Sequence, residues 1–148
     1  MRKFIGTKVI NAKPMTRLEY NQFRGWDFPS NENGADAGYL VEYVDGGKPN
    51  TDQFAGYVSW SPAEQFENAY RETSGMSFGL AIEALKKGLK VARAGWNGRG
   101  IYVQLVQAKD FEHSEMCAHF AIKNVRNSFD TWVASASDSL ADDWMMVE

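Results

Sequence analysis

Apolar and polar positions alternate in short stretches along the first half of the chain, which is the pattern of half-buried strands. Two stretches instead open with a capping box, Thr16 with Glu19 and Ser61 with Glu64, and each box predicts the start of a helix. The predicted strands and helices of this half are, in chain order, residues 4–12, 16–24, 39–43, 56–60 and 61–70. The first half is therefore expected to fold in the order βαββα.

The second half opens with apolar residues at helical spacing. Phe78, Ala81 and Leu85 follow a Ser77 cap, and Gly88 is a natural C-terminal stop. The elements expected next are strands at 89–93, 101–106 and 144–147, a loop at 109–117, a hairpin over 120–125 and 129–133, and a short irregular or helical segment at 135–142. We summarise this half as αββββ, and the whole chain as an α+β fold of small antiparallel sheets with short helices.

A polar stretch of mostly small residues, Arg71 to Gly75, separates the two halves and is the candidate domain boundary. A chain of 148 residues fits one ordinary domain or two very small ones. We predict two domains, residues 1–73 and residues 75–148. The sequence alone does not indicate what the first domain does.

The charge distribution limits the classes of partner. The net charge is −3, with 8 basic and 10 acidic side chains in the first 73 residues and 8 and 9 in the remainder. Nucleic-acid polymers demand many phosphate contacts, so neither half is expected to bind one, whereas a small anion needs only a local patch.

One cysteine, Cys117, allows no internal disulfide, and neither a signal peptide nor a membrane span is evident, so the cytosol is the expected compartment.

The most distinctive segment is residues 95–100, Gly-Trp-Asn-Gly-Arg-Gly. Its glycines allow backbone amides to approach a ligand, and Trp96 offers a stacking face for a base. Asn97 can bind polar edges, and Arg99 can donate two parallel hydrogen bonds to a phosphate. The alternative is a hairpin turn without a ligand, which the spacing alone favours.

A second candidate segment is residues 132–144, which combines two indoles, several hydroxyls and three carboxylates. Hydroxyls such as Ser137 and carboxylates such as Asp138 are suitable partners for ribose hydroxyls and adenine amino groups. The alternative is a helix-capping turn before a strand, with Trp132 and Trp144 in the core. Taken alone, this segment favours the structural interpretation, because buried aromatic residues usually serve packing.

Other candidate chemistry is weaker. His113, Cys117 and His119 could supply three metal ligands, but their spacing matches no established zinc signature, so neither a metal site nor a cofactor is predicted. The basic side chains of residues 86–93 suit a solvated helix end, with a ligand-facing role left open for one of them. No Gly-x-Ser-x-Gly elbow, Walker A motif or dinucleotide-binding fingerprint is present.

Several of these motifs together resemble a small phage domain. They are residues 76–88, the run Lys90-Val91-Ala92-Arg93, the 95–100 turn, and the ending with Trp132 and Ser137-Asp138-x-Leu140-Ala141-x-Asp143-Trp144. The domain that they resemble includes the Thoeris anti-defence proteins of the second type, which are phage signal sponges. The resemblance covers about residues 75–148, and residues 1–73 resemble an accessory segment that recurs in phage proteins.

The resemblance implies a function for the second half. Sponges of this family bind the cyclic ADP-ribose isomer made by bacterial TIR-domain immune enzymes without degrading it, and some relatives also bind cyclic oligonucleotides. Members assemble as homo-tetramers with ligand pockets at subunit interfaces. The ligand-binding residues implied at matching positions are Trp96, Asn97, Arg99, Trp132, Ser137 and Asp138. The resemblance also implies that the protein is not an enzyme and that it acts in the cytoplasm of the infected host. Many relatives have a glutamine where this chain has Ala136-Ser137. This difference leaves the identity of the ligand open.

Two other classes of function stay open at this stage. An enzyme that hydrolyses a nucleotide would need a base and a nucleophile, or a metal, and the concentrated candidates are His113, Cys117 and His119. In a phage structural or protein-interaction module, Trp96 and Trp132 would act through stability alone.

Overall fold

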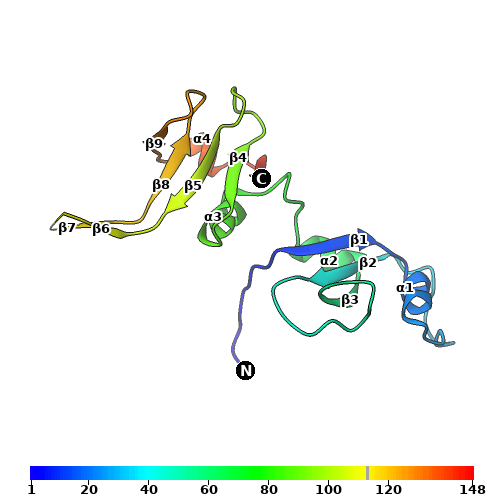
Figure 1. Cartoon of the computed structure of the whole chain (residues 1–148). Helices are drawn as coiled ribbons and strands as arrows, with labels where there is room; N and C mark the ends of the chain where they lie inside the picture. Colours follow the sequence, from blue (N-terminus) through cyan, green and yellow to red (C-terminus); the bar gives the residue numbers. More distant parts are fainter. Residues whose placement is uncertain (113) are drawn as a thin grey trace. The chain divides into compact units, whose positions relative to one another are not determined.

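The computed structural model describes residues 1–112 and 114–148 of the chain. The chain divides into two compact units, Met1–Tyr70 and Arg71–Glu148, called here the N-terminal unit and the C-terminal unit. Figure 1 shows the helices and strands of both units. The roles assigned to the two expected domains stay predictions. Within the described residues, none of the helices is both long enough and apolar enough to cross a membrane.

The N-terminal unit has the βαββα order that its sequence predicts. Its elements are β1 (Ile10–Pro14), α1 (Arg17–Arg24), β2 (Gly38–Tyr43), β3 (Tyr57–Pro62) and α2 (Ala63–Ala69). The three strands form an antiparallel sheet in the order β1-β2-β3, so β1 and β3 are its two edges.

A small hydrophobic core lies between α1 and one face of this sheet. Its centre is formed by Tyr20 of α1, Leu40 of β2 and Val58 of β3, all of which are buried. The capping box expected at the start of α1 is confirmed, since the Thr16 hydroxyl accepts the backbone N–H of Glu19 and the Glu19 carboxylate accepts that of Thr16. This cap fixes where α1 begins and so helps to place Tyr20 over the sheet.

The prediction for the first strand is wrong at its start. Residues 4–12 were expected to form it, but β1 begins only at Ile10, which pairs with Tyr43, the last residue of β2. Residues before Ile10 therefore have no strand-pairing partner on β2, and Phe4 and Ile5 are 91% and 101% exposed. Pro14 is the last residue of the strand, and the edge position of β1 tolerates its missing N–H.

The second capping box is also wrong. Pro62 is the N-cap residue of α2, and no side-chain hydrogen bond caps this helix. Ser61 is still part of β3 and pairs with Tyr39 of β2. Its hydroxyl is therefore not placed to accept a hydrogen bond from a backbone N–H in the first turn of α2. The strand continues directly into the helix without a capping loop.

The C-terminal unit combines one longer helix with an antiparallel sheet. Its elements are α3 (Phe78–Lys86), β4 (Lys90–Arg93), β5 (Tyr102–Val106), β6 (Lys109–Phe111), β7 (Ser114–Met116), β8 (His119–Lys123), β9 (Phe129–Thr131), α4 (Ala136–Ser139) and β10 (Trp144–Val147). Five strands form one sheet in the order β10-β4-β5-β8-β9, and β6 and β7 form a separate two-stranded sheet. The α+β class expected from the sequence is confirmed.

The core of this unit lies between α3 and one face of the five-stranded sheet. Ala81 and Leu85 of α3 pack against Val91 of β4, Val103 of β5 and Trp144 of β10, and all five are fully buried. Val91 pairs with Val103 on one side and with Met146 on the other, so these three side chains point to the same face of the sheet. Along each strand, the side chains on this core face recur at every second position.

Several boundaries in this unit agree with the sequence. The Ser77 hydroxyl accepts the backbone N–H of Leu80 at the start of α3, and Gly88 has a φ of +83° just after its end, as a left-handed stop requires. The expected hairpin is present as β8 and β9, with Ile122 opposite Asp130.

Residues 109–117 were expected to form a loop, and this prediction is wrong. Lys109–Phe111 and Ser114–Met116 pair as the hairpin β6–β7, so the unit contains more strands than the αββββ order allows. The turn places Glu112 at a φ of +56°, a conformation that sequence signals assign to glycine or asparagine. Without such a residue, the sequence carries no hairpin signal here.

Replacing Gly56 with alanine should destabilise the N-terminal unit. A Cβ at Gly56 would collide with the backbone carbonyl of Tyr43, which β2 holds in place. Overpacking of this kind typically costs about 1–3 kcal/mol. Urea unfolding followed by circular dichroism should show an earlier transition for Gly56→Ala, while Gly6→Ala, with open space around it, should match wild type. Equal midpoints for both variants would contradict the described loop packing.

Candidate functional site

Five aromatic side chains gather on the core face of the C-terminal sheet and are called here the aromatic cluster. They are Phe78, Trp96, Phe120, Trp132 and Trp144. The ring centroids of Trp144 lie 5.4 Å from those of Phe78 and Trp96 and 5.9 Å from that of Trp132. The two pairs with the other indoles are edge-to-face, an arrangement favoured by the charge distribution of aromatic rings.

Trp144 makes the closest ring contacts of this cluster. Its side chain is fully buried, and its indole Nε1–H donates to the backbone carbonyl of Asp138 at 3.0 Å. The sequence interpretation that placed this indole in the core is therefore confirmed. Its hydrogen bond also ties the start of β10 to α4.

Trp96 and Trp132, the two indoles predicted to bind ligand, contact each other, and Trp132 also contacts the other three rings of the cluster. Their centroids are 6.1 Å apart with the rings nearly perpendicular, and both side chains are half-buried. Trp96 follows β4 and Trp132 follows β9, so the sheet brings two distant segments into contact. Partly open indoles in this position can pack in a core and still present part of their surface to a flat ligand.

Asn97 and Arg99 lie on the surface of the 95–100 loop. Both side chains are exposed, and neither makes a hydrogen bond or ion pair with any residue that the structure describes. Gly98 shapes this loop, because it has a φ of +146° and an added Cβ would collide with the side chains of Ile101 and Val125. The loop therefore presents one amide and one guanidinium beside Trp96.

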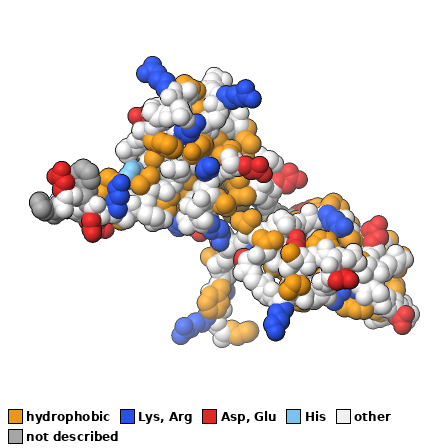
Figure 2. Space-filling model, viewed as in Figure 1, with side chains coloured by type: hydrophobic (Ala, Val, Ile, Leu, Met, Phe, Trp, Pro, Cys, Tyr) orange, Lys and Arg blue, Asp and Glu red, His pale blue; other side chains and the backbone are white. Residues whose placement is uncertain are grey.

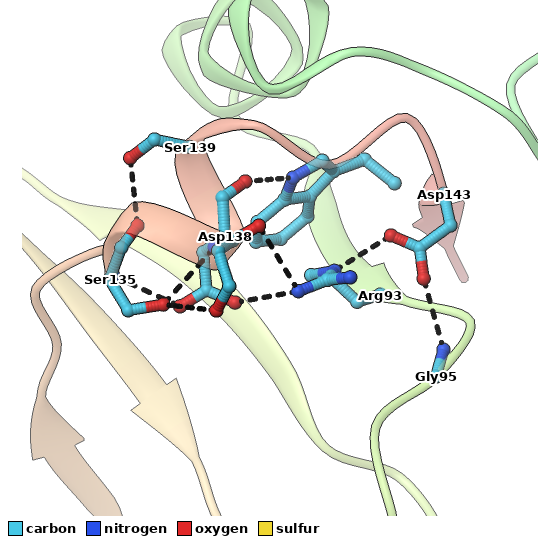
Figure 3. A network of polar contacts seen from close by, with 8 residues as sticks. Arg93, Gly95, Ser135, Asp138, Ser139 and Asp143 are labelled. Atoms are coloured by element: carbon cyan, nitrogen blue, oxygen red, sulfur yellow. Dashed lines mark hydrogen bonds and ion pairs between the residues drawn. The ribbon is translucent and has the colours of Figure 1, made fainter.

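Arg93 of β4 joins this loop to the C-terminal segment (Figure 3). Its Nε donates to Asp143 at 2.7 Å, and its Nη1 donates to Asp138 at 3.1 Å. The second oxygen of Asp143 accepts the backbone N–H of Gly95 at 3.2 Å. One guanidinium thus holds β4, α4 and the start of the 95–100 loop in a fixed relation.

Asp138 also closes a capping box at α4. The Ser135 hydroxyl accepts the backbone N–H of Asp138, and the Asp138 carboxylate accepts both the backbone N–H and the hydroxyl of Ser135. Ser137 is exposed, with its hydroxyl 2.9 Å from that of Ser135. Of these two predicted ligand-binding residues, Asp138 has its oxygens engaged within the fold, while Ser137 faces solvent.

These contacts set the charge states of the network. Burial raises the pKa of Asp138, but hydrogen bonds from Ser135 and Arg93 outweigh burial and leave that pKa below its usual value. The hydrogen bond from Arg93 holds the pKa of Asp143 down as well. Hydrogen bonds to Asp143 and Asp138 raise the pKa of Arg93. All three groups are therefore ionised at neutral pH.

The structure brings together some of the residues predicted from the sequence and adds one that was missed. Trp96 touches Trp132, and Asn97 and Arg99 share the loop beside Trp96. Arg93 was grouped with a solvated basic run, yet its side chain is 21% exposed and paired twice. Its position two residues after the core residue Val91 is the signal that could have placed it on the inner face.

The possible metal ligands give no site among the described residues. His113 lies outside those residues, Cys117 is exposed, and His119 Nδ1 lies 3.1 Å from the backbone oxygen of Cys117. In the part of the chain that the structure describes, no three histidine, cysteine, aspartate or glutamate side chains are grouped to hold an ion.

The fold and these contacts define a small α+β domain with an aromatic cluster bordered by exposed polar side chains. The sequence profile of the Thoeris anti-defense 2-like domain matches residues 76–147. Thoeris anti-defense 2 of Bacillus phage SP01 is 36% identical over 85 residues, which cover 49% of this chain and 94% of that relative. The chain therefore belongs to the Thoeris anti-defense 2 family, which supports a phage anti-defence role.

Replacing Arg93 with glutamine should lower the melting temperature of the C-terminal unit by several degrees at pH 7. Asp138 and Asp143 have lowered pKa values in the folded state, so their stabilisation is present above the ordinary carboxylate pKa of about 4 and is lost as the pH falls through the folded values. The difference between wild type and Arg93→Gln should therefore shrink below about pH 4.

Thermal unfolding between pH 7 and pH 2.5 measures this difference. Lys86→Gln is the matched control, because Lys86 makes an exposed ion pair with Glu83 that should contribute little. A melting-temperature difference for Arg93→Gln that stays constant over this pH range would contradict the assigned ion pairs.

Proposed function

We propose that this protein is a phage anti-defence protein that binds and sequesters a cyclic ADP-ribose-type immune signal without degrading it. The observation that carries the proposal is the contact of Trp96 with Trp132 beside the exposed side chains of Asn97 and Arg99, in a domain of the Thoeris anti-defense 2 family. We place the ligand on the exposed surface of these two half-buried indoles. The protein would act in the cytoplasm of the infected host.

The chemistry of the side chains fits such a ligand. An indole face stacks on a base with roughly 1–3 kcal/mol per contact. The Arg99 guanidinium can donate to two phosphate oxygens at once, and the Asn97 amide and Ser137 hydroxyl can bind base edges or ribose hydroxyls. Asn97 and Arg99 are exposed and make no hydrogen bond within the described residues, so they need not break one to bind, whereas Ser137 shares its hydroxyl with that of Ser135.

The network around Arg93 supports sequestration rather than hydrolysis. A general acid or base works best with a pKa near the operating pH, whereas the pKa values of Asp138 and Asp143 are shifted below their usual range. Both carboxylates also accept hydrogen bonds from Arg93. We therefore assign them to holding the site in shape and not to bond cleavage.

Sequestration also sets a requirement on affinity and assembly. To silence a signal, a sponge must hold it well below its working concentration, and nanomolar binding corresponds to about −12 kcal/mol. Trp96 and Trp132 are only half-buried within one chain, so a second copy that covers the ligand would bury more of its surface. We propose a homo-tetramer with the ligand held between subunits.

A thermal-shift assay with cyclic ADP-ribose isomers, followed by heat release and chromatography, tests the proposal. We expect a large rise in melting temperature with one isomer and recovery of that isomer unchanged. Recovery of an altered product would instead establish an enzyme. No shift with any isomer would contradict sequestration of this signal class, and cyclic di- and trinucleotides in parallel would show whether another signal is bound.

The double variant Asn97→Ala/Arg99→Ala tests the position of the site. Both side chains are exposed without internal partners among the described residues, so the melting temperature of the free protein should stay unchanged. Loss of a single charged hydrogen bond worth about 1.4 kcal/mol would weaken binding about tenfold, and we expect at least that. Arg126→Ala, an exposed change in the β8–β9 turn, is the control. If Asn97→Ala/Arg99→Ala and Arg126→Ala bound the ligand with equal affinity, the ligand would not be bound at the 95–100 loop.

A further inference from the structure

The two edges of the sheet in the N-terminal unit differ. At β3, the Asn50 side chain takes the place of a further strand, since its Oδ1 accepts the backbone N–H of Val58 and its Nδ2 donates to the Val58 carbonyl, both at 2.8 Å. Pro62, which has no N–H, ends this edge. No described residue takes such a place beside β1, which is therefore the open edge of the sheet.

The pairing of β1 with β2 shows which backbone groups of the open edge have no partner strand. The Met15 N–H donates to the Gly38 carbonyl at 2.9 Å, directly after Pro14 at the end of β1. Hydrogen bonds alternate along an antiparallel ladder, so the N–H and C=O groups of Ile10 and Ala12 point away from β2. Four backbone groups are therefore available to a further strand.

A second copy of β1 fits this edge in an antiparallel register. Pairing about Asn11 places Ile10 of each copy opposite Ala12 of the other, and each of these pairs exchanges two hydrogen bonds. Pro14, which lacks an N–H, then lies at the end of the pairing, opposite Lys8 of the other copy. In this register two three-stranded sheets join into one sheet of six strands.

The nine residues before β1, called here the arm, are rich in apolar and basic side chains and contain no acidic residue. Phe4 and Ile5 are almost fully exposed, and Arg2 and Lys3 make no hydrogen bond or ion pair with any residue that the structure describes. In Figure 2, which has the view of Figure 1, the arm stands away from the rest of its unit with orange and blue side chains. Its apolar side chains are thus left for a partner to cover.

A hollow of about 610 Å³ borders the start of β2 and the end of β3 in the same unit. Its lining includes the carboxylates of Glu32, Asp36 and Glu64, the half-buried indole of Trp60, and the Arg17 guanidinium, which pairs with Glu32. Three carboxylates and one guanidinium give these charged groups a net negative charge. The hollow is therefore suited to basic side chains that also carry apolar surface.

Antiparallel pairing carries the arm of one copy towards the hollow of the other. Within one chain, the arm leaves from the Ile10 end of β1, whereas the start of β2 and the end of β3 lie at the Pro14 end. Because the second β1 runs in the opposite direction, its arm continues past Pro14 of the first copy. Its first seven residues span roughly 20 Å when extended, and two strand spacings across the sheet are about 10 Å. The arm is therefore long enough to reach the hollow.

We propose that two copies of this chain associate through their N-terminal units, by antiparallel pairing of their β1 strands, with the arm of each copy docked in the hollow of the other. Arg2 and Lys3 then meet the carboxylates of the hollow, and Phe4 is covered beside Trp60. This interface is separate from the one proposed to hold the ligand and does not depend on it. The N-terminal unit thereby gains a role as an assembly module.

Disulfide cross-linking of the full chain tests the pairing. Cys117 is exposed, so Cys117→Ser is the background of all variants. In the proposed register the two Asn11 residues face each other as a non-hydrogen-bonded pair with Cα atoms about 4.5 Å apart, which is within disulfide range. We expect Asn11→Cys to form a covalent dimer under mild oxidation on a non-reducing gel. The control Lys48→Cys, at an exposed loop position, should stay monomeric.

Reversing the charge of the arm in the Asn11→Cys chain tests its docking. Arg2→Glu/Lys3→Glu should slow cross-linking about tenfold, because complementary charge speeds association by factors of this order. Lys87→Glu/Lys109→Glu makes the same change of charge at exposed positions of the C-terminal unit and should leave the rate unchanged. Melting temperatures show whether each variant folds.

A second pair of variants is needed if Asn11→Cys melts early, since Asn11 donates a hydrogen bond to Glu42 at 3.0 Å. Ile10→Cys mixed with Ala12→Cys should then cross-link faster than either variant alone. The pairing would be overturned if folded Asn11→Cys cross-linked no faster than Lys48→Cys, or if the mixture cross-linked no faster than its two components. An unchanged rate after charge reversal in the arm would overturn the docking of the arm.

Discussion

The C-terminal unit depends on the burial of one indole, that of Trp144. Its ring lies 5.4 Å from Phe78 of α3 and from Trp96, and 5.9 Å from Trp132, while its N–H bonds to the backbone of Asp138. Aromatic pairs contribute about 0.5–1.5 kcal/mol each beyond their burial. A single side chain near the end of the chain thus fixes the helix, the loop and the C-terminal segment that surround the site.

Arg93 adds the polar counterpart of this constraint. It reaches Asp138 and Asp143, and Asp143 in turn receives the N–H of Gly95, so the 95–100 loop is anchored on one side by charge and on the other by Trp96 in the aromatic cluster. A ligand that meets a loop held in this way does not have to order it, which preserves binding energy. The proposed sequestration needs this property, because it depends on affinity alone.

Much of the fold could be predicted from local signals, and the contacts of the site could not. The α1 cap, the α3 ends and the β8–β9 hairpin follow from residues a few positions apart. The ion pair of Arg93 with Asp143 spans 50 residues, and no local pattern encodes it. The β6–β7 hairpin was missed because its turn uses Glu112 where a glycine would have been the signal. Trp96 was singled out by its glycine-rich segment and Trp132 as a ligand residue by the resemblance, but their contact with each other depends on the sheet.

The central claim is that an intact nucleotide signal binds at Trp96 and Trp132 of the aromatic cluster. The most direct measurement is a nuclear magnetic resonance titration of the tryptophan indole N–H signals of the full chain with the cyclic ADP-ribose isomer. The account predicts that the signals of Trp96 and Trp132 move on saturation, that those of Trp26 and Trp60 in the N-terminal unit stay in place, and that the ligand spectrum is unchanged at the end. Movement confined to Trp26 or Trp60, no movement at all, or conversion of the ligand would contradict it.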